Sequence, residues 1–164
     1  MSESKVRLVE SGKSPVLEPG LEELIRQGKQ TGRLRASTKL DDAAREADAF
    51  LVAVGTPSAK NGSSDLSHLL RALGQLADVL KGVRKFQVVN VRSTVPPGTM
   101  RGSVIPLLEE RSGRQVGTEL GVGMNPEFLR EGTSVRDYDS APFDLCGVSD
   151  PRSAEVLKSL YAGN

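Results

Sequence analysis

LGVGMNPEFLREG, residues 120–132, is the stretch that decides how this chain folds and where a site would lie. Its apolar start, Leu120–Met124, predicts a buried strand. Asn125 can then cap a helix that has a proline at its first position. On that helical turn Glu127 and Glu131 would share one face at the carboxyl end of a strand, where open parallel sheets bind ligands. The alternative, a capped turn with two solvated glutamates, is the commoner arrangement of such residues.

Two stretches upstream repeat this order of an apolar strand followed by a polar loop. Residues 50–54 (FLVAV) run into Gly55-Thr56-Pro57, and residues 86–91 (FQVVNV) run into a loop at 92–99 (RSTVPPGT). Apolar spacing and capping residues predict helices within residues 2–12, 19–28, 40–47, 65–80 and 151–161, and another after residue 99. Further strands are expected at 34–38 and 143–148. Strands that alternate with helices predict a parallel α/β sheet, because parallel strands need crossover connections. In that sheet we expect residues 50–54 and 86–91 to be adjacent central strands, with 120–124 next outward.

Three polar residues follow the three apolar strands, namely Thr56, Thr94 and Glu131. The carboxyl ends of parallel strands meet at one edge of a sheet, so we expect these residues to converge there. Each threonine taken alone would brace a turn beside a proline, which is the commoner role. The repetition of strand, hydroxyl and proline instead favours two loops that face a nucleotide.

The composition excludes several classes of protein. The chain has 164 residues, the size of one domain, and its 22 Lys and Arg against 21 Asp and Glu predict no field that attracts nucleic acid or an acidic membrane. No run approaches the roughly 20 apolar residues of a transmembrane helix, and the first residues lack the apolar core of a secretion signal, which favours a cytoplasmic protein. Cys146 is expected to be a buried inert thiol, and His68 a solvated side chain that binds no metal.

Three ordered motifs resemble those of the NAD-dependent nucleotide-sugar 6-dehydrogenases. They are residues 55–58 (GTPS), 91–99 (VRSTVPPGT) and 125–131 (NPEFLRE). Residues 12–15 (GKSP) and 18–21 (EPGL) are similar to the corresponding segments of the branch that acts on GDP-mannose. The branch that acts on UDP-glucose shares many of these motifs, so UDP-glucose is the alternative substrate. The resemblance covers nearly the whole chain and implies an incomplete Rossmann-like doubly wound parallel sheet.

The resemblance implies oxidation of the C6 alcohol of a nucleotide sugar to a carboxylate, here GDP-mannose to GDP-mannuronate. Two hydrides pass to NAD, through a thiohemiacetal and a thioester on a cysteine. Carried over by position, Lys5, Thr56 and Thr94 resemble contacts to NAD, with Thr94 near the reacting carbon. Glu131 resembles the glutamate that contacts the sugar nucleotide and assists thioester hydrolysis, so Thr94 and Glu131 are the catalytic candidates. The substrate-binding loop matches Glu127, Phe128, Leu129, Arg130 and Glu131.

Some parts of that family are not matched within residues 1–164. The family begins with a strand, a Gly-x-Gly-x-x-Gly turn and a second strand, and its catalytic cysteine belongs after Asn164. We therefore expect residues 1–164 to be a partial NAD-binding domain that is inactive alone. The strand at 50–54 should have an open edge through which the chain self-associates, in a family whose members form homo-oligomers. A degenerate, non-catalytic nucleotide-binding or interaction protein is the alternative.

Overall fold

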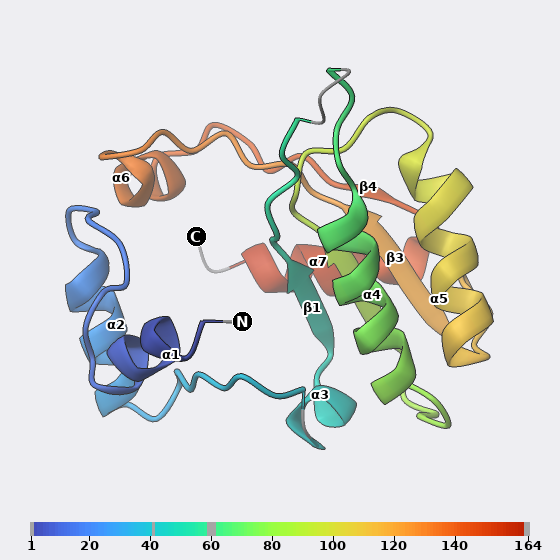
Figure 1. The fold of residues 1–164 in the computed structure, drawn as a ribbon, viewed down its shortest axis with the longest axis horizontal. Helices are drawn as coiled ribbons and strands as arrows, with labels where there is room; N and C mark the ends of the chain where they lie inside the picture. The colour runs from blue at the N-terminus through green and yellow to red at the C-terminus, as the bar shows by residue number, and fades with distance from the viewer. Residues whose placement is uncertain (1, 41, 59–61, 163–164) are drawn as a thin grey trace. The chain divides into compact units, whose positions relative to one another are not determined.

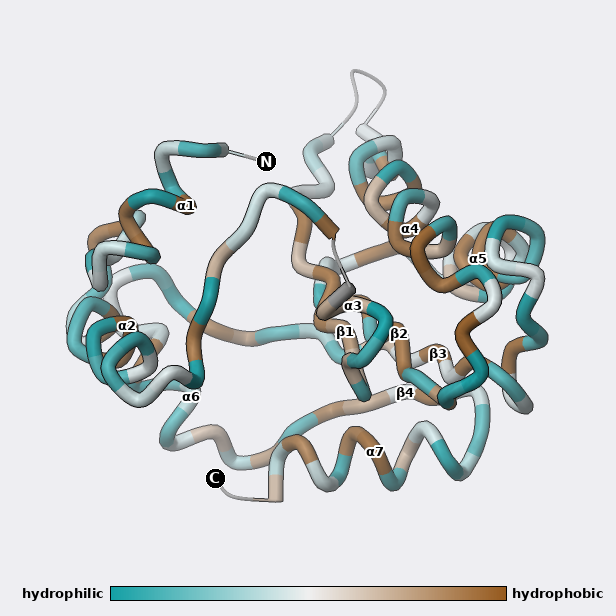
Figure 2. The backbone as a smooth tube through the Cα atoms, turned by 90° about the horizontal axis from the view of Figure 1, so that it is seen from below, coloured by the Kyte–Doolittle hydropathy of each residue, from teal (hydrophilic) through white to brown (hydrophobic). Residues whose placement is uncertain are grey.

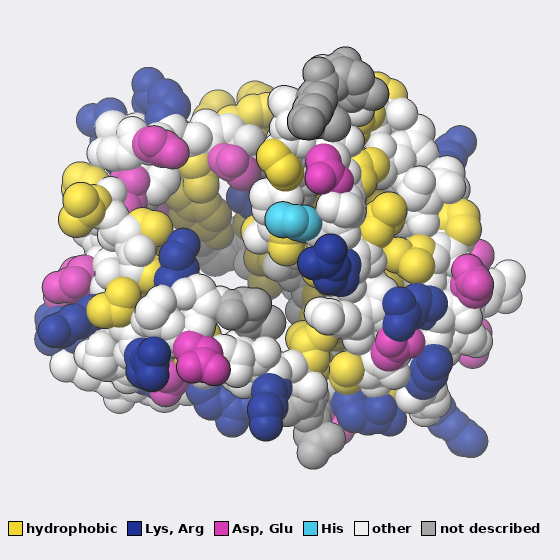
Figure 3. Space-filling model, viewed as in Figure 1, with side chains coloured by type: hydrophobic (Ala, Val, Ile, Leu, Met, Phe, Trp, Pro, Cys, Tyr) yellow, Lys and Arg dark blue, Asp and Glu magenta, His cyan; other side chains and the backbone are white. Residues whose placement is uncertain are grey.

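The computed structural model describes residues 2–40, 42–58 and 62–162, and the chain divides into two compact units. The larger unit lies within residues 41–127 and 144–164 and contains a sheet with its helices. The smaller unit joins residues 1–40 to 128–143 and is helical. On the face shown in Figure 3, Lys and Arg side chains are interspersed with Asp and Glu side chains. None of the helices in the described ranges is long and apolar enough to cross a membrane.

The sheet of the larger unit has its strands in the order in which they occur in the chain (Figure 1). They are β1 (Ala49–Val52), β2 (Gln87–Val91), β3 (Leu120–Met124) and β4 (Gly147–Val148). The first three strands are parallel, with Phe50 opposite Val89 and Val89 opposite Val122. This confirms the predicted parallel core and its order, and it places β1 at the edge of the described sheet.

The strand expected at residues 143–148 is shorter than predicted and runs in the opposite direction. Only Gly147 and Val148 pair with β3, and they do so antiparallel. Before β4, the carbonyl of Leu145 accepts a hydrogen bond from the Asn125 side chain at 2.8 Å, so it takes a side-chain partner instead of a strand partner. The sheet is therefore a mixed, Rossmann-like α/β sheet with one short antiparallel strand.

Helices cover both faces of this sheet, as a doubly wound arrangement requires (Figure 2). On one face lie α4 (Ser67–Val79) and α5 (Ile105–Ser112), and a π-helical turn, η1 (Met100–Val104), leads into α5. The short α3 (Asp42–Glu46) precedes β1. The main core between α4, α5 and the sheet is formed by Leu69, Leu73, Leu76, Ala77, Leu80, Val89, Val91, Val104, Leu108, Leu120 and Val122.

The other face is covered by α7 (Pro151–Tyr161), whose bounds agree with the prediction. Asp150 caps this helix, because its carboxylate accepts hydrogen bonds from the backbone N–H of Ser153 at 2.8 Å and from the Ser153 hydroxyl at 2.6 Å. The helix approaches β3 closely where the strand has glycines. A Cβ atom at Gly121 would collide with Ser153 Oγ, and one at Gly123 would lie 3.0 Å from the Leu157 side chain. The absent side chains therefore make room for α7.

A buried polar network holds the amino end of the sheet. Gln87 Nε2 lies within hydrogen-bond distance of the carbonyls of Ala44 and Arg45 in α3, each at 3.1 Å, and of Ala47, just after α3, at 2.8 Å. Gln87 Oε1 in turn accepts from the Arg114 guanidinium at 3.0 Å. Burial lowers the pKa of Arg114 from its usual value.

The smaller unit contains α1 (Glu3–Glu10), α2 (Leu21–Gln30) and α6 (Ser134–Asp139). Polar contacts connect these segments. Lys29 Nζ lies 2.7 Å from a carboxylate oxygen of Glu10. The Glu18 carboxylate accepts hydrogen bonds from the backbone N–H groups of Gly132 and Ser134, each at 2.8 Å, and so caps the start of α6.

Residues 34–38 form no strand, so that prediction was wrong. The backbone N–H of Leu34 donates to the Gly28 carbonyl in α2 at 3.0 Å. The N–H of Ala36 donates to the Glu10 carboxylate at 2.5 Å. Because helix carbonyls and a carboxylate take these donors, the segment joins no hydrogen-bonded ladder.

Candidate functional site

The loops that follow β1 and β2 are joined by two hydroxyl side chains. Ser93 Oγ donates to the Val54 carbonyl at 2.7 Å and accepts from the Val54 N–H at 2.9 Å. Thr56 Oγ1 donates to the Thr94 carbonyl at 3.1 Å. The structure thus brings Thr56 and Thr94 together at the carboxyl edge of two adjacent parallel strands, where α/β sheets bind their ligands.

Thr94 is the more accessible of the two threonines. Its side chain is exposed, and its hydroxyl makes no hydrogen bond to any residue that the structure describes, whereas Thr56 is half-buried. Gly55 leaves open space next to Thr56, since no heavy atom of the described residues, its two chain neighbours apart, lies within 4 Å of the position that its Cβ would take. A ligand can therefore approach the backbone at Gly55 and the hydroxyl of Thr94 closely.

The loop after β3 does not begin with the predicted helix cap, because the Asn125 side chain is hydrogen-bonded to other side chains. Asn125 is 1% exposed. Its Oδ1 accepts hydrogen bonds from the Arg92 guanidinium at 2.5 Å and from the Tyr161 hydroxyl at 2.6 Å. The Tyr161 hydroxyl also accepts from Arg92 at 3.0 Å. A carbonyl oxygen held in this way cannot cap a helix, and residues 125–130 are not helical.

Glu127 and Glu131 consequently do not share a helical face. The next helix, α6, begins only at Ser134, after a turn in which Gly132 has a φ of 82°. Both glutamate side chains are exposed. The prediction of two carboxylates on one helical turn is therefore wrong, and the two residues belong to different units.

The segment after Glu127 is ordered by contacts within the smaller unit. Arg130 donates to both oxygens of Asp137, from Nη2 at 2.7 Å and from Nε at 3.0 Å, and the Thr133 hydroxyl donates to the same carboxylate at 3.0 Å. The hydrogen bonds from Arg130 hold the pKa of Asp137 well below its usual range. The Phe128 ring meets the Phe143 ring edge to face, with centroids 6.2 Å apart. The Arg130 guanidinium is thus bound to the Asp137 carboxylate in this structure.

The predicted site residues fall in both units. Thr56, Thr94 and Glu127 belong to the larger unit, and Lys5 belongs to the smaller unit together with residues 128–131. Lys5 lies in the first turn of α1 with an exposed side chain. Leu129 and Phe128 are exposed apolar side chains, 37% and 64% accessible. Within the larger unit Thr56 and Thr94 are in contact, and within the smaller unit hydrogen bonds order residues 128–131.

Cys146 and His68 stay outside this arrangement. Cys146 is half-buried, and burial, followed by the charge of Asp144, raises the pKa of its thiol. The side chain is less buried than the sequence predicts, and a protonated thiol is a poor nucleophile, which agrees with the predicted inert character. His68 is exposed on α4. Within the described ranges, no three His, Cys, Asp or Glu side chains lie close enough together to hold a metal ion.

Three residues that shape this edge were not predicted from the sequence, namely Arg92, Ser93 and Tyr161. A small hydroxyl directly after a buried strand was a usable signal for Ser93. Tyr161 is 69 residues away from Arg92 along the chain, and no local pattern connects the two. Only the packing of α7 against the sheet brings the Tyr161 hydroxyl to Asn125.

Comparison with protein families and known sequences gives one consistent result. The family model for the UDP-glucose/GDP-mannose dehydrogenase family, NAD binding domain, matches residues 1–163. The chain is 45% identical to GDP-mannose 6-dehydrogenase of Pseudomonas syringae pv. tomato over 161 residues, which is 98% of this chain and 37% of that protein. It is 38% identical to a UDP-glucose 6-dehydrogenase of Haloferax volcanii over 162 residues, 99% of this chain and 37% of that protein.

Solved structures show the same likeness in three dimensions. A ternary complex of GDP-mannose dehydrogenase from Pseudomonas aeruginosa matches with a TM-score of 0.95 at 42% identity, over 99% of this chain and 37% of that one. A UDP-glucose dehydrogenase from Pyrobaculum islandicum matches with a TM-score of 0.90 at 34% identity, over 99% and 37%. The predicted Rossmann-like fold is confirmed, and the chain spans about 37% of the length of these relatives.

Proposed function

The chain belongs to the UDP-glucose/GDP-mannose dehydrogenase family, and we propose that it is part of the NAD-binding domain of a nucleotide-sugar 6-dehydrogenase. The reaction is oxidation of the C6 alcohol of GDP-mannose to the carboxylate, as part of a longer enzyme. The observation that carries the proposal is the contact between Thr56 and Thr94 at 3.1 Å, which joins two of the family motifs at the carboxyl edge of the sheet. GDP-mannose is preferred to UDP-glucose because the 45% identity to the first kind of enzyme exceeds the 38% to the second.

The residues at this edge fit a dinucleotide. The exposed hydroxyl of Thr94 and the open space at Gly55 allow close approach, and they lie beside the half-buried Thr56. In the proposal Thr56, Thr94 and Lys5 bind NAD, which supplies the hydride acceptor when it is bound. Thr94 positions the reacting carbon through its hydroxyl, which makes no hydrogen bond within the described ranges.

The 127–131 segment is proposed to bind the nucleotide sugar. The hydrogen bonds between Arg130 and Asp137 order this turn before a substrate binds. The exposed side chains next to Arg130 can then contact the nucleotide sugar, namely Glu127, Phe128, Leu129 and Glu131. Glu131 is the proposed acid–base residue, which assists hydrolysis of the enzyme-bound thioester. Because both proposed ligands are soluble nucleotides, the proposal also places the protein in the cytoplasm.

Two measurements test the function. NAD is titrated into the chain and followed by ligand-observed NMR, where Thr94→Val should abolish a signal that Thr118→Val, at an exposed threonine elsewhere in the larger unit, leaves intact. A chimera that carries residues 2–162 in place of the matching part of the P. aeruginosa enzyme should produce NADH from GDP-mannose, and Glu131→Gln should stop it. Binding of NAD without turnover in the chimera would favour a non-catalytic nucleotide-binding protein.

The open edge of β1 is proposed to pair with the same strand of a second copy. The Asp48 carbonyl accepts from Val88 in β2 and the Val52 carbonyl from Arg92 just after it, so the intervening Leu51 directs its backbone away from β2. Leu51 is also 49% exposed on this strand. Leu51→Lys should reduce self-association in sedimentation, because a charge on an edge strand opposes pairing. Leu24, also a leucine and 50% exposed, is the control, and an equal effect of Leu24→Lys would contradict the proposal.

A further inference from the structure

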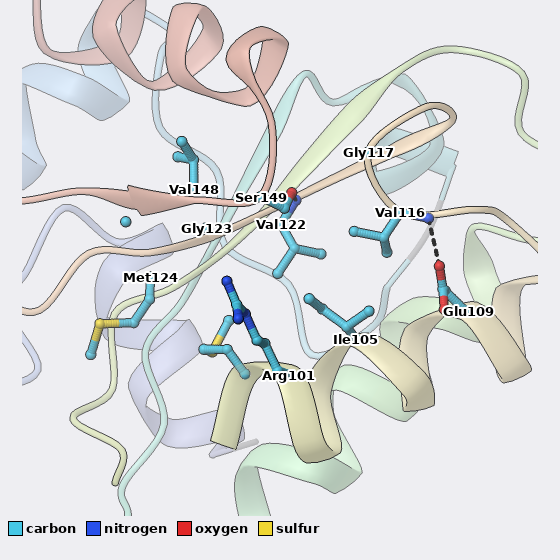
Figure 4. A pocket seen from close by; sticks show the side chains of 12 residues that line it. Arg101, Ile105, Glu109, Val116, Gly117, Val122, Gly123, Met124, Val148 and Ser149 are labelled. Carbon is cyan, nitrogen blue, oxygen red and sulfur yellow. Dashed lines mark hydrogen bonds between the residues drawn. The ribbon is translucent and has the colours of Figure 1, made fainter. Parts of the chain in front are cut away.

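A pocket lies between the η1–α5 helix and the strands β3 and β4 (Figure 4). Its volume is about 490 Å³, which is within the range of roughly 300–1,000 Å³ for small-molecule sites. None of the residues assigned above to NAD or to the nucleotide sugar lines it. Most of its wall is formed by the apolar side chains of Met100, Ile105, Val116, Val122, Met124 and Val148.

One cationic side chain points into this pocket. In Figure 4, Arg101 extends from the helix toward Gly123 and Met124. It is the only Lys or Arg among the lining residues. No carboxylate of the described residues pairs with it, whereas Arg111 and Arg130 both bind aspartates. The guanidinium of this exposed residue therefore has no carboxylate partner among the described residues and faces a wall that is mostly apolar.

The single acidic residue of the lining, Glu109, is already engaged. Its carboxylate accepts the backbone N–H of Val116 at 2.9 Å, the bond drawn in Figure 4. Glu109 lies further along the η1–α5 helix than Arg101. The pocket is therefore positive at the Arg101 end, apolar along the wall that leads away from it and negative at Glu109, whose charge the hydrogen bond does not remove.

We propose that this pocket binds a small carboxylic acid with an apolar body. The carboxylate would accept two parallel hydrogen bonds from the Arg101 guanidinium, the geometry in which arginine binds carboxylates best. The apolar body would lie along Ile105 and Val122, where burial removes it from water. A single cation and an apolar wall suit a monoanion, and they supply too few donors for a phosphate. The proposal uses other residues than the dehydrogenase site and does not depend on it.

The test uses 4-phenylbutyrate, an elongated apolar monoanion, as the probe. It is titrated into the isotope-labelled full chain, and the amide signals of Gly117, Gly123 and Gly147 in the pocket wall report binding. We expect saturable shifts at these amides. The neutral analogue 4-phenylbutyramide should bind at least about tenfold more weakly, because the charge-assisted hydrogen bonds are lost.

Variants of Arg101 separate binding through the guanidinium from binding of the probe through its apolar body alone. Arg101→Met should weaken 4-phenylbutyrate binding by about tenfold or more, and Arg101→Lys should keep part of the affinity. Arg84→Met removes an exposed cation of the same unit that does not line the pocket, and it should leave the affinity unchanged. Amide signals away from the pocket show that each variant is folded.

Three outcomes would overturn the proposal. They are the absence of saturable shifts at the three glycines, equal affinity for the acid and the amide, and unchanged affinity in Arg101→Met. Shifts at Thr56 and Thr94 instead of the pocket wall would assign the acid to the dehydrogenase site. NAD binding should be the same in Arg101→Met as in the unaltered chain, so that failure here is distinct from failure of the proposed function.

Discussion

Whereas the larger unit is built around leucines and valines that solvent does not reach, the smaller unit has one buried apolar side chain among its described residues, Ile25. Its segments are connected by partly exposed polar pairs such as Arg130 with Asp137 and Lys29 with Glu10. Close packing makes a core sensitive to changes of volume, while exposed pairs respond to pH and salt. We therefore expect changes of side-chain volume to destabilise the larger unit, and changes of pH or salt to destabilise the smaller one.

The same contrast exists inside the larger unit, between neighbouring strands. Every residue of β2 is buried, but none of β1 is, although the two strands pair residue by residue. β1 (AFLV) is the more apolar of the two, since β2 (QVVNV) contains Gln87 and Asn90, so composition does not explain the difference. β2 has a strand on each side, while β1 has one at the edge of the described sheet. Burial follows from the number of neighbours.

The largest effect is expected where α7 touches β3. Gly121→Ala places a Cβ against Ser153 Oγ, which Asp150 holds by a 2.6 Å hydrogen bond and which therefore does not move aside freely. We expect a loss of about 3 kcal/mol in the free energy of unfolding, measured by urea denaturation. In a Ser153→Ala background the same change should cost less, because the clash is partly removed. A loss below about 1 kcal/mol would show that α7 is not closely packed.

A pair of variants tests the contrast between interior and edge strands. Val89→Ala in β2 should cost about 2 kcal/mol, since it removes methyl groups from a site that is 0% exposed. Leu51→Ala in β1 should cost less than about 1 kcal/mol, although it removes more atoms, because Leu51 is 49% exposed. Both are read from the midpoint of urea unfolding. The reverse order would mean that the edge of β1 is covered.

A stabilising change is expected inside β2. Asn90 is 0% exposed, and neither its side-chain oxygen nor its nitrogen has a hydrogen-bond partner among the described residues. Asn90→Val should raise the free energy of unfolding by about 1–2 kcal/mol, because the cost of an unsatisfied buried amide is removed. Asn90→Asp is the control and should destabilise the unit. A lower unfolding midpoint for Asn90→Val would refute this interpretation.

The smallest effect concerns the smaller unit and appears as a dependence on pH. Hydrogen bonds from Arg130 hold the pKa of Asp137 below its usual value, so the folded turn binds this proton less readily than the unfolded chain. The contribution of this pair to the stability of the folded turn is then complete above the unfolded pKa of about 3.9, and it is lost as the pH falls through the lower pKa of the folded state. The amide signals of Arg130 and Thr133 should stay constant from pH 7 to about 4 and change below that.

Asp137→Asn provides the comparison for this titration. The variant should show altered Arg130 and Thr133 signals at every pH, since the charged acceptor is gone, while Asp139→Asn, at an exposed aspartate nearby, should titrate like the unaltered chain. If the unaltered chain shows no transition below pH 4, the pair does not order the turn. High salt should weaken the contact, because the Arg130 side chain faces solvent.

Local pattern was sufficient to predict most of the elements and the family. Apolar runs at β1, β2 and β3 and helical spacing at α4 and α7 depend on near neighbours in the chain, and these elements formed as predicted. The motifs at Thr56 and Thr94 were predicted to converge, and the parallel register places them together. A parallel sheet needs only strand order and direction to align its carboxyl ends.

The start of the helix after β3 shows what local pattern could not predict. Asn125-Pro126 has the composition of a helix start, yet the helix begins at Ser134, where Glu18 supplies the capping oxygen from more than 100 residues away. Asn125 instead satisfies the Arg92 guanidinium and the Tyr161 hydroxyl. Which of several polar groups a side chain bonds depends on what packing brings within about 3 Å, and that information is not local in the sequence.

The sequence by itself therefore determined the α/β class, the strand order and the two threonine loops, because periodicity and turn chemistry are properties of short segments. Tertiary structure alone decided the antiparallel direction of β4, the partners of Asn125 and the pocket in which Arg101 has no carboxylate partner among the described residues. These features arise where segments distant in the chain compete for the same space and the same hydrogen bonds. The physical reason is that burial and polar pairing are settled between elements after each element has formed.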